Sequence, residues 1–208
     1  MSRPSTSAHA AAPQIEPLTL TGARVELQPL DELRHRGGLA DAIRDGELWT
    51  IKETLVPHPD ALGGFFFDAD RALQDGRELA FATVDRESGA IAGSTRFRMF
   101  DGANRRVEIG FTFLSARFQR TYVNSEAKLL MLTHAFETWG MNRVELLTDV
   151  RNAKSRAAIA RIGASQEGIL RAHMVLPDGY VRDSVIFSIT APEWPAARAA
   201  LQQRLSAS

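Results

Sequence analysis

The stretch that decides the fold opens with an apolar, β-branched segment, Val107-Glu108-Ile109-Gly110-Phe111-Thr112-Phe113-Leu114. A polar turn and a helix start follow, Gln119-Arg120-Thr121-Tyr122-Val123-Asn124-Ser125. Val, Ile and Phe favour a strand, which we place at 106–114. Apolar residues around most of the circumference of 125–139 predict a buried helix, which Gly140 ends. The stretch therefore predicts a strand that leads through a turn into a helix N-terminus.

Alternating and periodic patterns on both sides of this stretch predict the remaining elements. We expect strands at 25–30, 78–85, 90–99, 144–149, 167–176 and 180–189, and helices at 32–45, 60–75, 153–162 and 192–205. The strands from 78 to 114 form an antiparallel meander, whereas the crossover helix at 125–139 requires a parallel neighbour. The predicted fold class is α+β (mixed α/β), with a central, mixed, mostly antiparallel sheet of six to seven strands flanked by helices.

Composition limits the classes of function. The 208 residues suit one domain, which we place at 15–208 after a disordered tail at 1–14 that is a poor signal peptide. A formal net charge of zero offers no global field for nucleic acid or an anionic membrane, and no apolar run approaches a membrane span. The absence of cysteine excludes disulfides, thiolate metal sites and a cysteine nucleophile, and it fits a cytoplasmic protein.

The helix start is the first candidate for a binding site. Free backbone N–H groups and the helix dipole at such a start favour a diphosphate. Side-chain donors are added by Gln119, Arg120, Thr121, Asn124 and Ser125. An ordinary capped helix start is the alternative interpretation.

A set of short motifs in register carries a resemblance to a known family. They are Glu108-Ile109-Gly110, Asn124-Ser125-Glu126-Ala127-Lys128, Asn152 with Ser155, Ile162-Gly163-Ala164, Glu167-Gly168, Leu170-Arg171 and Arg182-Asp183. In this order they resemble the GCN5-related N-acetyltransferase (GNAT) superfamily, and most of all its branch of ribosomal-protein N-terminal (RimJ/RimL-type) acetyltransferases. The resemblance covers about residues 18–189 and implies acetyl-CoA as the cosubstrate. Family members carry small residues where this chain has Tyr122 and Asn124, so we expect a variant phosphate loop.

The resemblance implies roles for individual residues in binding acetyl-CoA. Backbone groups of Phe113 and Leu114 would pair with the pantetheine arm, and Asn152 would hydrogen-bond it. An N-cap is the alternative role for Asn152, and the two roles are compatible. The pyrophosphate would lie on the loop that comprises Gln119, Arg120, Thr121, Tyr122, Val123, Asn124 and Ser125. The 3′-phosphate would contact Arg120, Lys154 or Arg156, and no metal is expected because the histidines are scattered.

Catalysis requires a base that removes a proton from the ammonium group. Glu108 is the candidate, because it is the acidic residue on the strand that leads to the thioester. The alternative is an edge carboxylate paired with Arg105, Arg106 or Arg143. Ile159 occupies the position of the tyrosine that other members use to protonate the thiolate, so Ser155, Tyr122 or solvent would take that role.

The acceptor is expected to be a primary amine, either a protein N-terminus or a small molecule, near Trp49 and His173. Both residues also have a structural interpretation, as a core side chain and as a satisfied histidine. The resemblance further implies a homodimer formed through the last strands or the C-terminal helix. A catalytically inactive acyl-CoA-binding module is the alternative function, whereas a nucleic-acid-binding domain has little support.

Overall fold

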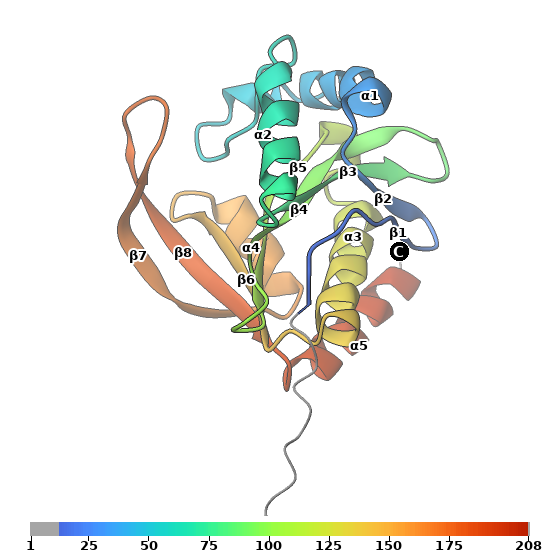
Figure 1. Ribbon diagram of the computed structural model, residues 1–208, viewed down its shortest axis with the longest axis vertical. Coiled ribbons are helices and arrows are strands. Elements are labelled where there is room, and N and C mark those ends of the chain that lie inside the picture. The colour runs from blue at the N-terminus through green and yellow to red at the C-terminus, as the bar shows by residue number, and fades with distance from the viewer. Residues whose placement is uncertain (1–12, 208) are drawn as a thin grey trace, which may run out of the picture.

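The computed structural model describes residues 13–207, so most of the predicted tail, residues 1–12, lies outside the described part. In that part eight strands form one sheet in the order β1-β2-β3-β4-β5-β6-β8-β7 (Figure 1). Their bounds are Leu20–Thr21 (β1), Val25–Pro29 (β2), Leu79–Asp85 (β3), Ile91–Asp101 (β4), Arg106–Leu114 (β5), Arg143–Asp149 (β6), Ser165–Val175 (β7) and Val181–Thr190 (β8).

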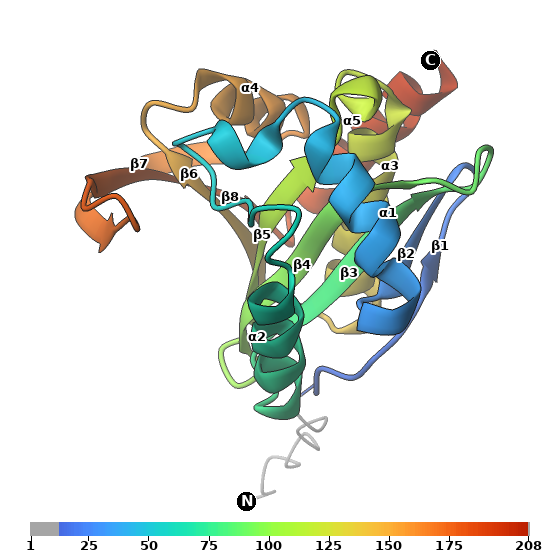
Figure 2. The same cartoon turned by 90° about the horizontal axis from the view of Figure 1, so that it is seen from above.

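Helices cover both faces of this sheet. Their bounds are Glu32–Arg44 (α1), Gly63–Gln74 (α2), Tyr122–Thr133 (α3), Ala153–Arg161 (α4) and Trp194–Ser206 (α5). Figure 2 shows α1 and α2 in front of the sheet and α3 and α5 behind it. The larger hydrophobic cluster includes Met131 of α3 and Leu201 of α5, and a smaller one joins α1 and α2 to Phe113 of β5. The central strands are therefore packed on both faces.

The fold class predicted from the sequence is confirmed. Every neighbouring pair of strands is antiparallel except β5 and β6, which are parallel. The sheet exceeds the predicted six to seven strands because the two-residue strand β1 adds an edge that no sequence pattern indicated.

Two helix starts differ by three residues from the sequence-based boundaries. The prediction that Asp60 starts α2 was wrong: the helix begins at Gly63, and Asp60 instead forms an ion pair with Arg44 at 2.7 Å. The helix predicted from residue 125 begins at Tyr122, because the hydroxyl of Thr121 caps it by accepting the N–H of Val123. Residues 122 to 125 of the polar loop thus belong to the first turn of α3.

Between residues 13 and 207, no helix has the length and apolar character needed to cross a bilayer.

Candidate active site

The strands β5 and β6 separate soon after they begin to pair. Their parallel register covers only Arg106–Glu108 against Arg143–Glu145. Both strands continue beyond this point, β5 to Leu114 and β6 to Asp149, without pairing with each other. The unpaired part of β5 stays attached to β4 on its other side, where Phe113 lies opposite Ser94. An opening with unsatisfied strand edges is thus formed, and an extended ligand can pair with it as an added strand.

The N-terminus of α3 follows β5 after a short turn. Backbone N–H groups in the first turn of a helix have no acceptor within it. Those of Tyr122 and Asn124 find no acceptor among the other described residues. Together with the helix dipole, they form a site suited to an anion such as a phosphate.

The loop reaches this geometry without the small residues that the family usually carries. Tyr122 and Asn124 both lie within α3, where helical dihedral angles suit any side chain. The residue with a positive φ is Arg120, at 65°. Gln119 steadies the loop by donating from Nε2 to the carbonyl of Leu114 at 2.9 Å. The side chains of Gln119 and Arg120 are exposed, as is that of the capping residue Thr121.

Tyr122 is held away from a catalytic role by its contacts. Its hydroxyl donates to Asp85 at the end of β3, and the guanidinium of Arg24 lies 3.9 Å from its ring centroid. The hydrogen bond to Asp85 raises the pKa of Tyr122 to about 12. A phenol held in this way is a poor proton donor to a thiolate.

The start of α4 brings Asn152 and Ser155 to the end of β6. Asn152 Oδ1 accepts the N–H of Ser155 at 2.8 Å, so Asn152 is the N-cap of α4. Its Nδ2 makes no hydrogen bond within residues 13–207 and can donate to a ligand. The hydroxyl of Ser155 likewise has no partner there, whereas Arg156 reaches back to the carbonyl of Val150 at 3.4 Å.

Glu108 lies at the vertex of the opening, as the last residue of β5 that pairs with β6. The residue is 6% exposed, and Arg98 Nη1 lies 3.2 Å from its Oε1. This partner differs from the three arginines considered in the sequence-based alternative. Burial raises the pKa of Glu108, and the positive charge of Arg98 opposes that rise. A carboxyl with a raised pKa is better matched to a proton transfer near neutral pH.

The segments predicted to contact the acceptor flank the same side of the sheet. The rings of Trp49 and His58 meet edge to face at 5.3 Å, in the segment between α1 and α2. Trp49 packs against the smaller hydrophobic cluster, which contains Phe113. His173 is exposed on β7, and its Nδ1 lies 2.9 Å from the hydroxyl of Ser184 on β8.

A sequence model described as "Acetyltransferase (GNAT) domain" matches residues 24–165, which is more than half of the chain. The chain belongs to the GNAT acetyltransferase family. It is 33% identical over 106 residues to the protein of Bacillus subtilis (strain 168) called "Putative ribosomal N-acetyltransferase YdaF". That alignment covers 51% of this chain and 57% of the relative, so the chain is matched over little more than half of the relative's length.

Solved structures of other GNAT proteins share the fold. A GCN5-related N-acetyltransferase from Brucella melitensis superposes with a TM-score of 0.83 and 30% identity, covering 93% of this chain and 87% of that one. Mycobacterium smegmatis RimJ, crystallised with CoA-disulfide, has a TM-score of 0.72 at 22% identity, covers 93% and 95% of the two chains, and shares the fold. The GNAT family expected from the sequence motifs is thereby confirmed.

Three cations of this GNAT domain lie in surroundings that the sequence analysis did not predict. Lys128 on α3 is fully buried, and its Nζ donates to Thr112 at 2.8 Å and to Thr95 at 3.1 Å. Arg98 and Arg182 lie on the other face of the sheet, close to Glu108. The alternation Arg96-Phe97-Arg98 placed two arginines on one face, but it did not reveal that this face is covered.

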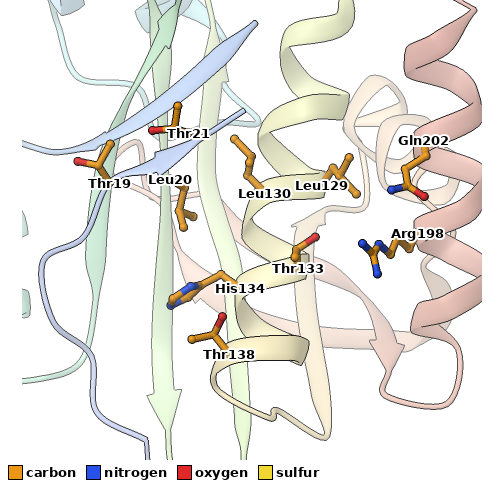
Figure 3. A pocket seen from close by; sticks show the side chains of 10 residues that line it. All are labelled: Thr19, Leu20, Thr21, Leu129, Leu130, Thr133, His134, Thr138, Arg198 and Gln202. Carbon is orange, nitrogen blue, oxygen red and sulfur yellow. The ribbon is translucent and has the colours of Figure 1, made fainter. Parts of the chain in front are cut away.

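The GNAT site described above does not coincide with the hollow shown in Figure 3. That hollow of about 380 Å³ lies between β1, α3 and α5. None of the residues that line it is a sequence-predicted site residue. In the described part of the chain, no three His, Cys, Asp or Glu side chains gather in a way that could hold a metal ion.

Proposed function

We propose that this GNAT protein transfers an acetyl group from acetyl-CoA to a primary amine, on a protein N-terminus or on a small molecule. The observation that carries the proposal is the opening between β5 and β6, which has Glu108 at its vertex and the free amides of α3 at its mouth. The name of the Bacillus subtilis relative supports a protein acceptor.

Three features of the described chain fit acetyl-CoA. The amides of Tyr122 and Asn124 suit the pyrophosphate, because they are donors without acceptors at the positive end of a helix dipole. The unpaired edge of β5 at Phe113 and Leu114 suits the amide groups of the pantetheine arm. The free Nδ2 of Asn152 supplies one more donor to that arm.

The chemistry requires a neutral amine, because an ammonium group has no lone pair. Glu108 accepts the proton of the ammonium group through an intervening water, since its carboxylate is buried at the vertex. The amine nitrogen then forms a bond to the thioester carbon, and backbone amides of β5 stabilise the oxyanion. The carbon–sulfur bond breaks and the attached nitrogen loses its second proton to solvent. The thiolate takes a proton from solvent, or from Ser155, which solvent then reprotonates.

Thiol release from acetyl-CoA, measured across a panel of amines and N-terminal peptides, tests the proposal directly. Turnover with at least one amine is expected, and Glu108→Gln should reduce it while acetyl-CoA binding persists. The exposed Glu16→Gln is the matched control and should behave as the wild type. Calorimetric binding of acetyl-CoA without thiol release for any amine would overturn the transfer function and favour a binding module.

The two roles of Asn152 can be separated by substitution. Asn152→Ser keeps a capping oxygen but removes the amide donor, whereas Asn152→Ala removes both. A higher KM for acetyl-CoA in both variants, with lost stability in the alanine variant alone, supports the contact with pantetheine. An unchanged KM in both variants would reduce Asn152 to a helix cap.

A further inference from the structure

Two arginines on β4 form a charged layer beneath α2. Arg96 pairs with Glu78 at 3.0 Å, and Arg98 pairs with Glu78 at 3.5 Å and with Glu108 at 3.2 Å. The side chain of Arg96 is 7% exposed and that of Arg98 is 23% exposed. Part of the Arg98 guanidinium therefore reaches solvent beside the vertex carboxylate Glu108.

A bulge in β5 supports this layer with an aromatic ring. The register between β4 and β5 shifts between Ser94 and Arg96, and Phe111 adopts a φ of 46° at the bulge. The guanidinium carbons of Arg96 and Arg98 lie 4.9 Å and 4.4 Å from the centroid of the Phe111 ring. A bulge re-aims a side chain, and cation–π contacts fix both guanidinium groups in place.

A third guanidinium approaches the same place from β8. Arg182 is half-buried, its side chain makes no ion pair or hydrogen bond with another residue in the range 13–207, and its Nε is buried without a partner. Asp149, Glu108 and Arg98 are all near enough for their charges to act on it. Asp149 is already occupied, because Arg151 binds both of its carboxylate oxygens, at 3.0 Å and 2.7 Å.

One guanidinium group near the vertex lacks an ion-pair partner. Arg96 and Arg98 pair with Glu78 and Glu108, and Glu145 pairs with Arg143, whereas the side chain of Arg182 forms no ion pair within residues 13–207. A buried N–H group without an acceptor costs free energy, and the Nε of Arg182 is in this condition. An incoming carboxylate would supply the missing acceptor and the missing negative charge.

This inference rests on the proposed function. We infer that the acceptor of this GNAT protein is an acidic amine, whose carboxylate binds Arg182 with help from Arg98 while its amino group faces Glu108. In a protein acceptor the carboxylate belongs to an Asp or Glu close to the N-terminal amine. In a small acceptor it belongs to an amino acid or a similar amino carboxylate. Both sources share the same chemistry, a carboxylate near a primary amine.

Paired substrates test this inference. The peptides Ser-Asp-Glu-Ala and Ser-Asn-Gln-Ala, both with amidated C-termini, differ only in carboxylates, and a free amino carboxylate is compared with its amide in the same way. We expect kcat/KM to favour the acidic peptide or the amino carboxylate by about tenfold or more, as for a charge-assisted hydrogen bond. The preferred pair identifies which source is used.

Variants of Arg182 sharpen the test. Arg182→Gln should reduce the ratio of acidic to amide substrate towards one, and Arg182→Glu should shift the preference to Ser-Lys-Lys-Ala. Arg204→Gln removes an exposed arginine near the end of α5, and it should keep the wild-type ratio. Acetyl-CoA binding by each variant confirms that it is folded.

Two negative results have different meanings. Turnover with equal kcat/KM for the acidic and amide substrates, or an unchanged ratio in Arg182→Gln, overturns the acidic acceptor and leaves acetyl transfer intact. The absence of turnover with every amine, although acetyl-CoA binds, overturns the proposed function and this inference together.

Discussion

A buried cation has different partners on the two faces of the central strands β4 and β5. On the α3 face, the hydrogen-bond partners of Lys128 Nζ within residues 13–207 are the hydroxyls of Thr95 and Thr112, and burial lowers its pKa from 10.5 to about 7. On the α2 face, Arg96 and Arg98 are bonded to Glu78 and Glu108. Hydroxyl dipoles do not balance a buried ammonium, whereas carboxylates balance a guanidinium, which keeps its proton.

The difference shows which face of the sheet pairs its buried cations with carboxylates and which face pairs them with hydroxyls. The α2 face carries guanidinium groups that are paired with carboxylates, and it is the face that we assign to the acceptor. The α3 face carries a cation that can become neutral, within the core beneath the site for acetyl-CoA. Four substitutions test this contrast, in order of expected effect.

Arg96→Met should cause the largest loss. It leaves Glu78 buried with only the longer ion pair to Arg98, and breaking a buried ion pair on one side costs about 3–5 kcal/mol. Urea denaturation measures the loss of unfolding free energy. The double variant Arg96→Met with Glu78→Gln should recover much of it, and a loss below about 1 kcal/mol in the single variant would show that the pair is not needed.

Glu108→Gln should reduce kcat about 100-fold or more, as expected for removal of a general base. The raised pKa of Glu108 sets the sign of the pH dependence. Wild-type activity falls as the pH decreases through that pKa, because the carboxylate is the active form. Initial rates across pH test this point, since the variant should lack this acidic limb. If Glu108→Gln shows the same fall in rate at low pH as the wild type, the base is another group.

Lys128→Met tests whether the buried side chain of Lys128 loses its proton near neutral pH. The pKa of Lys128 is lowered on folding, from 10.5 to about 7. The unfolded chain therefore binds more protons between these values, so wild-type stability rises with pH in that window. Relative to Lys128→Met, we expect a rise of up to about 2 kcal/mol between about pH 7.5 and about pH 9. If the unfolding free energy of the wild type and that of Lys128→Met change equally with pH, the lowered pKa of Lys128 is contradicted.

Thr112→Val should have the smallest effect. It removes a hydroxyl that lies 2.8 Å from Lys128 Nζ and 2.8 Å from the Thr95 hydroxyl, and these hydrogen bonds together contribute on the order of 1 kcal/mol. Thermal unfolding at about pH 9, where Lys128 is neutral, measures this loss. Thr121→Val is no control because it removes a helix cap. Thr19→Val is the better reference, since Thr19 is exposed and its hydroxyl makes no hydrogen bond within residues 13–207.

Local chemistry explains the parts of the fold and site that the sequence predicted. Asp31 directly precedes the helix predicted at 32–45, and its Oδ1 accepts the N–H of Arg34 at 2.8 Å. Gly76 directly follows the helix predicted at 60–75, and it has a φ of 67°. The N-cap role of Asn152, considered as an alternative, is also present. Each of these depends on contacts between residues close in sequence.

The remaining features depend on residues that are distant in the chain. Glu108 was expected to pair with Arg105, Arg106 or Arg143 if it was only structural, but its partner is Arg98 on the neighbouring strand. A bulge shifts the register between these strands, so no count along the sequence gives this pairing.

The sequence by itself determined the order of the elements, the helix start after β5 and the family, because strand alternation, caps and ordered motifs act within short segments. Only the tertiary structure decided that Arg98 pairs with Glu108 and that Lys128 is buried against hydroxyls. The physical reason is that alternation assigns a side chain to a face of the sheet, whereas sheet order, splaying and packing decide which charges that face contains.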